Sequence, residues 1–194
     1  MNILTLSSFK TYLFMLFLLS GTLRSQEMLV PIDVQVELIS KILTFNRSLS
    51  PRNGDTIVVA ILYQKIFRPS NTTKTDFLNF TDSGKLRVFG GLPYRVLALE
   101  ITSTLREIAS TMLDLIDVLY VTPLRSVDMN DLKTMTRRKQ ILTVTGVPEY
   151  VEEGLALGID MKGQKPQILI NLPAAKAEGA DFSSGLLNLA RVIR

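Results

Sequence analysis

Residues 56–63 read TIVVAILY, an unbroken apolar and β-branched run with the length of one strand. A strand with one solvent-exposed face alternates apolar and polar residues, whereas a run without alternation is typical of a strand covered on both faces, as in a parallel sheet. Further candidate strands follow at residues 94–101 (YRVLALEI), 116–121 (IDVLYV) and 141–145 (ILTVT). We therefore expect an α/β fold with a mainly parallel sheet at its centre.

Helical patterns lie before and between these strands. Residues 31–45 repeat apolar side chains at helical spacing, and Pro31 suits a first helical turn. The apolar stripe of this helix consists of Val34, Leu38, Ile42 and Phe45. Further helices are predicted over residues 73–81 and 102–115, and after a cap at Asp128 or Asn130 to about Arg138. The alternation of strands and helices predicts a sheet of five to six strands flanked by helices.

The C-terminal region predicts an antiparallel hairpin. Residues 156–162 and 167–171 are candidate strands joined only by the short stretch GQKP. A parallel crossover needs about a dozen residues or more, so these strands are expected to pair antiparallel at an edge of the sheet. A helical turn over residues 173–178 and an amphipathic helix over residues 183–193 follow. We expect the last helix to turn inward Leu186, Leu189, Ala190 and Ile193.

The first 25 residues have the pattern of a secretory signal peptide. Lys10 supplies a positive start, residues 12–19 (YLFMLFLL) form an apolar run, and the small residue Ser25 can precede a cleavage site. The run is too short to span a bilayer, which takes about 20 residues. We expect cleavage near Ser25 and a single exported domain of residues 26–194.

The charge of the mature part argues against nucleic-acid binding. Cleavage after Ser25 removes Lys10 and Arg24 but no acidic residue, so the formal net charge falls from +4 to +2. The densest basic run, Arg137-Arg138-Lys139, falls at the end of a predicted helix, where positive charge is favourable. No basic stripe of the kind that follows a nucleic-acid backbone remains.

The composition also argues against most enzyme chemistry, because the chain has no Cys and no His. Disulfides, thiol nucleophiles, the Ser-His-Asp triad and the usual zinc sites are thereby excluded. Mechanisms based on carboxylates, on Lys or on a bound cofactor stay open. We expect a non-enzymatic protein without a metal or cofactor.

Two local clusters have explanations simpler than a site. Gly90-Gly91 lacks the spacing of a phosphate-binding loop and is expected to form a turn. Glu149, Glu152 and Glu153 follow Pro148 at helical spacing, which is typical of an exposed first turn. A catalytic role for these acids would need a buried pair in one cleft, which could include Asp160.

The carboxyl ends of the predicted parallel strands are the expected place for a small ligand or a partner contact. Open α/β sheets bind ligands outside these ends. The residues at this edge are Gln64, Lys65, Thr122, Thr145 and Gly146. The expectation comes from the fold alone and names no chemistry.

Four segments follow one another in the C-terminal half: residues 141–145 (ILTVT), Gly154, residues 168–171 (ILIN) and residues 183–190 (SSGLLNLA). In this order they resemble the YfiR-like family of periplasmic regulators. The family pattern has a strand ending near LTVS, a glycine a few residues on, a strand ending in FEIN, and a final helix similar to SSQLLRLA. Residues 116–121 and the helix before the first strand also fit.

The resemblance implies a compact, non-enzymatic periplasmic domain, often a homodimer. The best-known member of the family holds down a membrane-bound diguanylate cyclase and is released when an outer-membrane lipoprotein sequesters it. Related domains occur as extracellular sensory modules of signalling proteins. By resemblance, we expect binding to a membrane-bound signalling protein (a diguanylate cyclase or a sensor kinase) and to an outer-membrane lipoprotein. Repression of a cyclase would lower cyclic-di-GMP and biofilm formation.

Three departures from the family pattern bear on the partner surface. Leu169 stands where the family usually has an acidic residue before the Ile-Asn pair, which here ends at Asn171. Asn46-Arg47-Ser48 replaces a common Trp-Pro, and the paired cysteines of many members are missing. We include Leu169 and Asn171 among the candidate contacts on the strength of this resemblance.

Several functions stay open at this point. A periplasmic regulatory partner protein is supported by the leader, the resemblance and the missing catalytic residue types. An exported small-molecule-binding sensor would need an apolar pocket with a few convergent polar groups. A carboxylate enzyme and a purely structural secreted domain complete the set. The regulatory reading predicts an exposed apolar patch of more than a few hundred Å².

Overall fold

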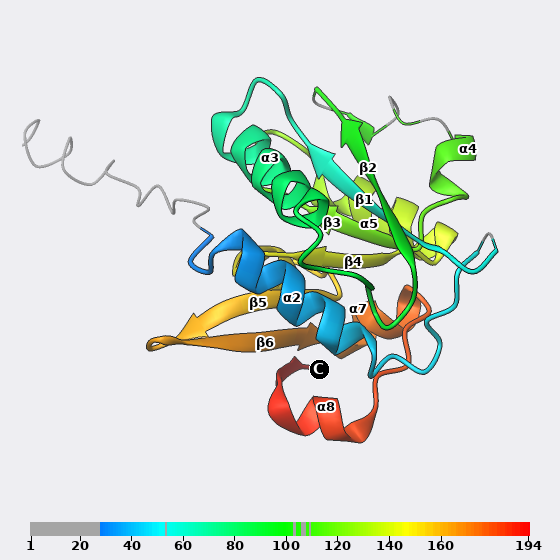
Figure 1. Cartoon of the computed structure of the whole chain (residues 1–194), viewed down its shortest axis with the longest axis vertical. Coiled ribbons are helices and arrows are strands. Elements are labelled where there is room, and N and C mark those ends of the chain that lie inside the picture. The colour runs from blue at the N-terminus through cyan, green and yellow to red at the C-terminus, as the bar shows by residue number, and fades with distance from the viewer. Residues whose placement is uncertain (1–27, 53, 103, 106–107, 109) are drawn as a thin grey trace, which may run out of the picture.

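The computed structural model describes residues 28–52, 54–102, 104–105, 108 and 110–194 (Figure 1). The expected signal peptide and its cleavage site lie outside this part of the chain. The leader and the boundary of the mature domain therefore stay predictions.

The described residues form a seven-stranded sheet in the order β2-β1-β3-β4-β5-β6-β7. All neighbouring strands are parallel except β5 and β6, which are antiparallel. The strands are β1 (Ile57–Tyr63), β2 (Tyr94–Glu100), β3 (Val118–Val121), β4 (Leu142–Thr145), β5 (Leu157–Lys162), β6 (Lys165–Asn171) and β7 (Arg191–Ile193). The predicted α/β class, the mainly parallel sheet and the C-terminal hairpin are confirmed, and the sheet has one strand more than the upper expectation.

β1 lies inside the parallel part of the sheet, as its uniform apolar sequence predicts. It pairs with β2 on one side and with β3 on the other. Val59 and Ile61 enter the hydrophobic core on one face of the sheet, whereas Ala60 and Leu62 enter the core on the opposite face. Burial on both faces explains why the sequence does not alternate.

Helices cover both faces of the sheet (Figure 1). The face that holds Val59 is covered by α2 (Ile32–Leu43), α3 (Arg68–Asp82), α7 (Leu172–Ala177) and α8 (Ser184–Leu189). The opposite face is covered by α4 (Ser110–Leu113), α5 (Met129–Lys139) and α6 (Pro148–Glu152). Asp128 caps α5, because its side chain accepts a hydrogen bond from the backbone N–H of Asn130 at 2.7 Å.

The helix predicted over residues 102–115 is far shorter in the structure. Among the described residues of this stretch, the only α-helix is α4, which has one turn. Leu105 and Ile108 are nevertheless buried in the core beside α5. The apolar spacing in this stretch therefore reflects burial of individual side chains rather than a continuous helix, and Thr102 and Thr104 are poor helix formers.

The helix predicted over residues 183–193 ends early, at Leu189. Ala190 is extended, with φ −96° and ψ 154°, and residues 191–193 then form β7 beside β6. Leu189 was expected to face inward but is 74 % exposed, whereas Leu186 is buried. Pairing with β6 satisfies backbone groups of the β6 edge that a longer helix would leave open. β7 is consequently the edge strand of the sheet, and the hairpin of β5 and β6 lies next to it.

Only part of the apolar stripe predicted on α2 is buried: Ile42 lies in the core and Leu38 is half-buried against it. The core contacts are made by Val36, Ile39, Ile42 and Leu43, and Val34 and Phe45 are exposed. The buried arc is rotated because Gln35 and Ser40 are also turned inward, where each finds a hydrogen-bond partner. Periodicity located the helix but missed its buried polar residues.

No helix within the described stretches combines the length and the apolar character needed to cross a membrane.

Candidate functional site

In the sheet, β2 lies on one side of β1, whereas β3, β4 and β5 follow on its other side. The chain therefore changes its direction of progress across the sheet between β1 and β3, although these two strands are parallel. Doubly wound sheets bind ligands at such a switch point, outside the carboxyl ends of the strands. Gln64 follows β1 there and is buried. Its side-chain N–H group donates to the carbonyl oxygens of Thr102 and Arg125, and its oxygen accepts from the Arg125 N–H at 2.7 Å. Gln64 thus bridges the loops that follow β2 and β3.

Ser70, at the start of α3, contacts the residues that follow β1 and β3 at the same carboxyl edge. The Ser70 hydroxyl lies 2.6 Å from the Thr122 hydroxyl and accepts from the Gln64 N–H at 2.8 Å. Thr122 donates in turn to the carbonyl of Leu62 at 2.8 Å, so Ser70 is the donor between the two hydroxyls. The hydroxyl groups of Ser70 and Thr122 are therefore already hydrogen-bonded within the protein.

Gln35 fills the carboxyl edge next to β4. Its side-chain oxygen accepts from the Tyr120 hydroxyl at 2.8 Å, and its nitrogen donates to the carbonyl of Val30 at 2.6 Å. A Cβ atom on Gly146 would lie 2.2 Å from the Gln35 side-chain oxygen, so this close approach requires glycine. Full burial raises the pKa of Tyr120, which keeps the hydroxyl a hydrogen-bond donor.

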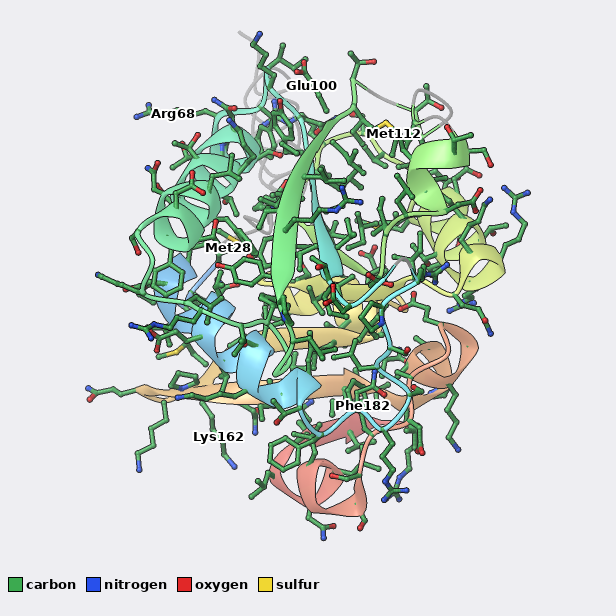
Figure 2. All side chains as sticks on the ribbon, turned by 45° about the vertical axis from the view of Figure 1, so that its right-hand side comes forward. Met28, Arg68, Glu100, Met112, Lys162 and Phe182 are labelled. Atoms are coloured by element: carbon green, nitrogen blue, oxygen red, sulfur yellow. The ribbon has the colours of Figure 1, made fainter. Side chains whose placement is uncertain are left out.

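The N-terminal end of the described chain covers the same region. The thioether of Met28 lies 3.7 Å from the Tyr120 hydroxyl and 3.8 Å from the hydroxyl of Thr73 on α3. Figure 2 shows Met28 between α2 and α3. The carboxyl edge of the sheet is therefore packed with the protein's own side chains.

The remaining candidate residues also have internal roles. Thr145 donates to the Val121 carbonyl at 2.9 Å, and Asn171 caps α7 while donating to the Val151 carbonyl at 2.9 Å. Leu169 has no exposed surface. Of the candidates at this edge and on β6, Lys65 alone is exposed. Whether a partner or a ligand contacts them stays a prediction.

The opposite edge of the sheet is open. A hollow of about 310 Å³ lies at the amino ends of β3 and β4, between the loop after α2 and the segment after α7. It is lined by Asn46, Ser48, Leu49, Ser50, Arg52, Asp117, Gln140, Leu142, Glu178, Gly179 and Ala180. Figure 2 shows Phe182 near this end and Glu100 at the far end, where β2 finishes.

Glu178 is the most deeply buried charged group of the hollow, with 2 % of the residue exposed. Its carboxylate accepts from the Thr143 N–H at 2.8 Å, from the Thr143 hydroxyl and from the Thr136 hydroxyl. Burial raises the pKa of Glu178 to about 7, although these hydrogen bonds and the charge of Arg137 oppose the rise. The group can therefore change its charge near neutral pH.

Asp117 and Arg52 form the other charged part of the lining. The Asp117 carboxylate accepts from the backbone N–H groups of Val58 at 2.8 Å and Arg52 at 2.9 Å. The Arg52 guanidinium lies 3.6 Å from this carboxylate and donates to the Gln140 carbonyl. Asp117 thus holds the start of β1 and the loop before it against β3.

The sequence reasoning missed this hollow. Asp117 could have been noticed, because it interrupts the apolar run IDVLYV, and an acid in such a run must be paired or exposed. Glu178 gave no comparable signal, since Glu before Gly is ordinary at a helix end. Neither residue lies near the other in sequence, so the hollow depends on tertiary structure.

A second hollow, of about 320 Å³, lies between α4 and α5 and is mostly apolar. Its lining residues are Leu105, Ile108, Ser110, Leu113, Asp131, Thr134, Met135 and Arg138. Leu105 and Ile108 contribute to one wall.

The acidic cluster after β4 does not show the arrangement of a carboxylate enzyme. Glu152 forms an exposed ion pair with Arg191 at 2.5 Å, and Glu153 is exposed. One oxygen of Glu149 is buried without a hydrogen-bond partner. In the described residues, no group of three or more Asp and Glu residues could hold a metal ion.

Exposed apolar side chains gather on α2 and directly after it. Val34 and Leu38 lie about one turn apart on the helix, and Phe45 follows the C-cap residue Thr44, with 45 % of Phe45 exposed. Leu38 is half-buried against the core. Asp33, Glu37 and Lys41 are exposed beside this stripe. An apolar strip with a polar border is typical of protein interfaces.

Solved structures share this fold. An ABC domain in complex with L-Trp from Streptococcus pneumoniae aligns with a TM-score of 0.58 and 16 % identity, covering 84 % of this chain and 62 % of that one. A conserved domain protein from Vibrio cholerae gives 0.61 and 12 %, with 84 % and 60 % covered. The substrate-binding protein CD0873 from Clostridium difficile, in a ligand-free open structure, gives 0.55 and 15 %, with 85 % and 60 % covered.

The chain thus spans about three-fifths of the length of these structures, and at such identities the likeness concerns the fold alone. A comparison with curated proteins finds no match. The model of a protein family described as YfiR/HmsC-like matches residues 73–191, which is more than half of the chain. The resemblance inferred from the ILTVT, ILIN and SSGLLNLA segments is confirmed. The chain belongs to the YfiR/HmsC-like family, a family of periplasmic regulatory proteins.

Proposed function

We propose that this protein restrains a membrane-bound diguanylate cyclase by binding its periplasmic part, and so lowers cyclic-di-GMP and biofilm formation. The general regulatory role comes with the family. The observation that carries the specific proposal is the apolar stripe of Val34, Leu38 and Phe45, on the outer side of α2 and directly after its end. Exposed apolar side chains that lie together are a feature of protein interaction sites.

The stripe suits a regulatory contact for a second reason. α2 packs on the core through its other side, so the outer side can bind a partner without unfolding the helix. The exposed charges of Asp33, Glu37 and Lys41 would form the solvated border of such a contact. A sensor kinase with a similar periplasmic part could use the same surface, and an outer-membrane lipoprotein would compete for it.

The experiment is affinity capture from solubilised membranes with tagged residues 26–194, followed by mass spectrometry of the retained proteins. The wild-type protein should retain a membrane cyclase or a sensor kinase. The double variant Val34→Asp, Phe45→Asp should lose it, because two charges would be buried in the interface. Both side chains are exposed in the free protein, so folding should be preserved.

Ile66→Asp is the matched control. Ile66 is apolar and 88 % exposed but lies between β1 and α3, away from the outer side of α2. This variant should retain the partner at the wild-type level. Equal capture by the α2 variant and the wild type would exclude the stripe as the contact, and capture of no signalling protein by the wild type would count against the whole proposal.

A small-molecule-binding sensor is the second candidate function. It is favoured by the hollow at the amino ends of β3 and β4, which combines a buried carboxylate with several polar groups. The two functions are compatible, because Asn46 in this hollow lies directly after the helix that carries the apolar stripe. A ligand in the hollow could then influence partner binding on α2.

A further inference from the structure

We propose that the hollow at the amino ends of β3 and β4 binds a small organic ammonium compound that has an oxygen acceptor close to its nitrogen. Amino alcohols and amino acids share this chemistry. The inference extends the second candidate function by naming the ligand class, and it does not depend on the cyclase proposal.

The charges of the lining favour a cation. Asp117 and Glu178 line the hollow with 6 % and 2 % of each residue exposed, and Arg52 is the single basic residue of the lining. With both acids ionised, the described lining therefore has a net negative charge. Arg52 already pairs with Asp117, and burial makes Glu178 hold its proton more tightly than usual even though the charge of Arg137 opposes this. An ammonium group in the hollow would supply the missing positive charge.

Asn46 adds a hydrogen-bond donor that a ligand can use. Its side-chain oxygen accepts from the Ser48 hydroxyl at 2.8 Å, from the Asp181 N–H at 2.9 Å and from the Ser48 N–H at 3.3 Å. The two backbone N–H groups fix the orientation of the amide, since the single proton of the Ser48 hydroxyl can instead go to the Gly179 carbonyl at 2.6 Å. The side-chain nitrogen of Asn46 makes no hydrogen bond within the described part of the chain and is open to solvent, because Glu149 Oε2 is the single buried side-chain atom without a partner among the described residues. This nitrogen can therefore donate to an oxygen atom of a ligand in the hollow.

The size and the lining of the hollow restrict the class of ligand that can bind. A volume of about 310 Å³ lies at the lower end of small-molecule pockets, which suits a compound of amino-acid size. No aromatic side chain lines the hollow, so the stacking platform that bases and many sugars use is missing from the described lining. Leu49, Leu142 and Ala180 supply a limited apolar wall.

The test is calorimetric titration of residues 26–194 with ethanolamine and with L-serine. Ethylene glycol and L-lactate serve as probes that keep the oxygen but lack the ammonium group. Binding of either amine at millimolar concentration, with no heat from the neutral or anionic probes, is the expected result. Binding of ethanolamine alone assigns an amino alcohol, and binding of serine alone assigns an amino acid. Equal binding of ethylene glycol, or no binding of any amine, would overturn the proposal.

Glu178→Gln is the variant that removes the charge and keeps the shape. Affinity for the amine should fall about tenfold or more, because a charged hydrogen-bond partner is replaced by a neutral one. Glu152→Gln, on the surface and outside the lining, should bind like the wild type. If Glu178→Gln does not fold, nuclear magnetic resonance of the wild type decides. Ethanolamine should shift the side-chain amide signal of Asn46 and leave that of Asn79 on α3 unchanged; an unmoved Asn46 signal would contradict the proposed site.

Discussion

The two edges of the same sheet are built in opposite ways. At the carboxyl edge, Gln64, Thr122 and Gln35 each use their polar atoms on neighbouring backbone or side chains, and little space is left. At the amino edge, Asp117 and Glu178 line a hollow of about 310 Å³. Doubly wound sheets normally place the ligand at the first of these edges.

The difference shows that strand order locates the ends of strands but does not decide whether a site lies there. Long side chains that reach from one loop to the next convert the usual crevice into packed interior. Shorter residues, such as Ser48, Ser50 and Ala180, leave room at the other edge. We call the packed carboxyl edge the closed edge and the amino edge with the hollow the open edge. Substitutions at the closed edge should lower stability, whereas substitutions at the open edge should change the pH dependence of stability and ligand binding.

The largest effect is expected from Gly146→Ala at the closed edge. The new Cβ atom would lie 2.2 Å from the Gln35 oxygen, so Gln35 must leave its bonds to Tyr120 and Val30. Overpacking and unpaired polar groups together should cost about 3–5 kcal/mol of unfolding free energy. Urea unfolding measures this loss. Gly185→Ala, in exposed α8, is the control and should be neutral or slightly stabilising; equal behaviour of the two variants would show that the edge is not tightly packed.

A pH-dependent effect is expected from Glu178 at the open edge. Its pKa in the folded protein is about 7, against the ordinary value of 4.5, so between these values the folded state binds more protons than the unfolded state. Its contribution to stability is fully present below about pH 4.5 and is lost as the pH rises toward 7, by roughly 3 kcal/mol at most. Urea unfolding across this range should show a falling component in the wild type that Glu178→Gln lacks. Parallel pH profiles of the two proteins would refute the shift.

A smaller loss is expected from Gln64→Leu at the closed edge. The variant keeps the approximate volume but removes the hydrogen bonds of Gln64 to the Arg125 N–H and to the Thr102 carbonyl. Unfolding free energy should fall by about 2 kcal/mol. Lys65→Leu, at the exposed neighbouring position, should change stability by about 0.5 kcal/mol or less. A neutral result for Gln64→Leu would mean that water replaces the bridge and that the edge is more open than its contacts suggest.

The smallest effect is expected from Asp128→Ala, which removes an ordinary helix cap. Asp128 accepts one backbone hydrogen bond at the start of α5 and is exposed. Loss of about 1 kcal/mol is expected, and thermal unfolding should detect it. This value is the baseline for a local contact near the closed edge. A loss of unfolding free energy as large as that of Gly146→Ala would show that one helix cap contributes as much as the tight packing around Gly146.

Much of the sheet could be predicted from the sequence, because buried strands are apolar over their whole length. TIVVAILY, IDVLYV and ILTVT all form strands, and the short GQKP connection correctly indicated an antiparallel pair. Segments held in place by distant partners were predicted less well. β7 is held in an extended conformation by pairing with β6. The sequence RVI alone does not distinguish a strand from the end of a helix.

The open edge could not be predicted for the same physical reason. Glu178, Asp117 and Arg52 come from three segments that are far apart in sequence, and only the fold brings them around one hollow. The exposed stripe of α2 was visible as a repeat, but its position relative to the core was not. Gln35 and Ser40 find hydrogen-bond partners inside, and a pattern that counts only apolar residues assigns such positions to the surface.

The contact between Gly146 and Gln35 has a consequence for how related sequences can diverge. A side chain at position 146 is tolerated only if position 35 becomes shorter, and a shorter residue at 35 would leave the Tyr120 hydroxyl and the Val30 carbonyl without a partner. The three positions should therefore change together across relatives or stay fixed together, although they lie on α2, on β3 and after β4. Covariation of positions 35, 120 and 146 would mark the relatives in which this edge is closed, and its absence would mark those in which the usual crevice is open.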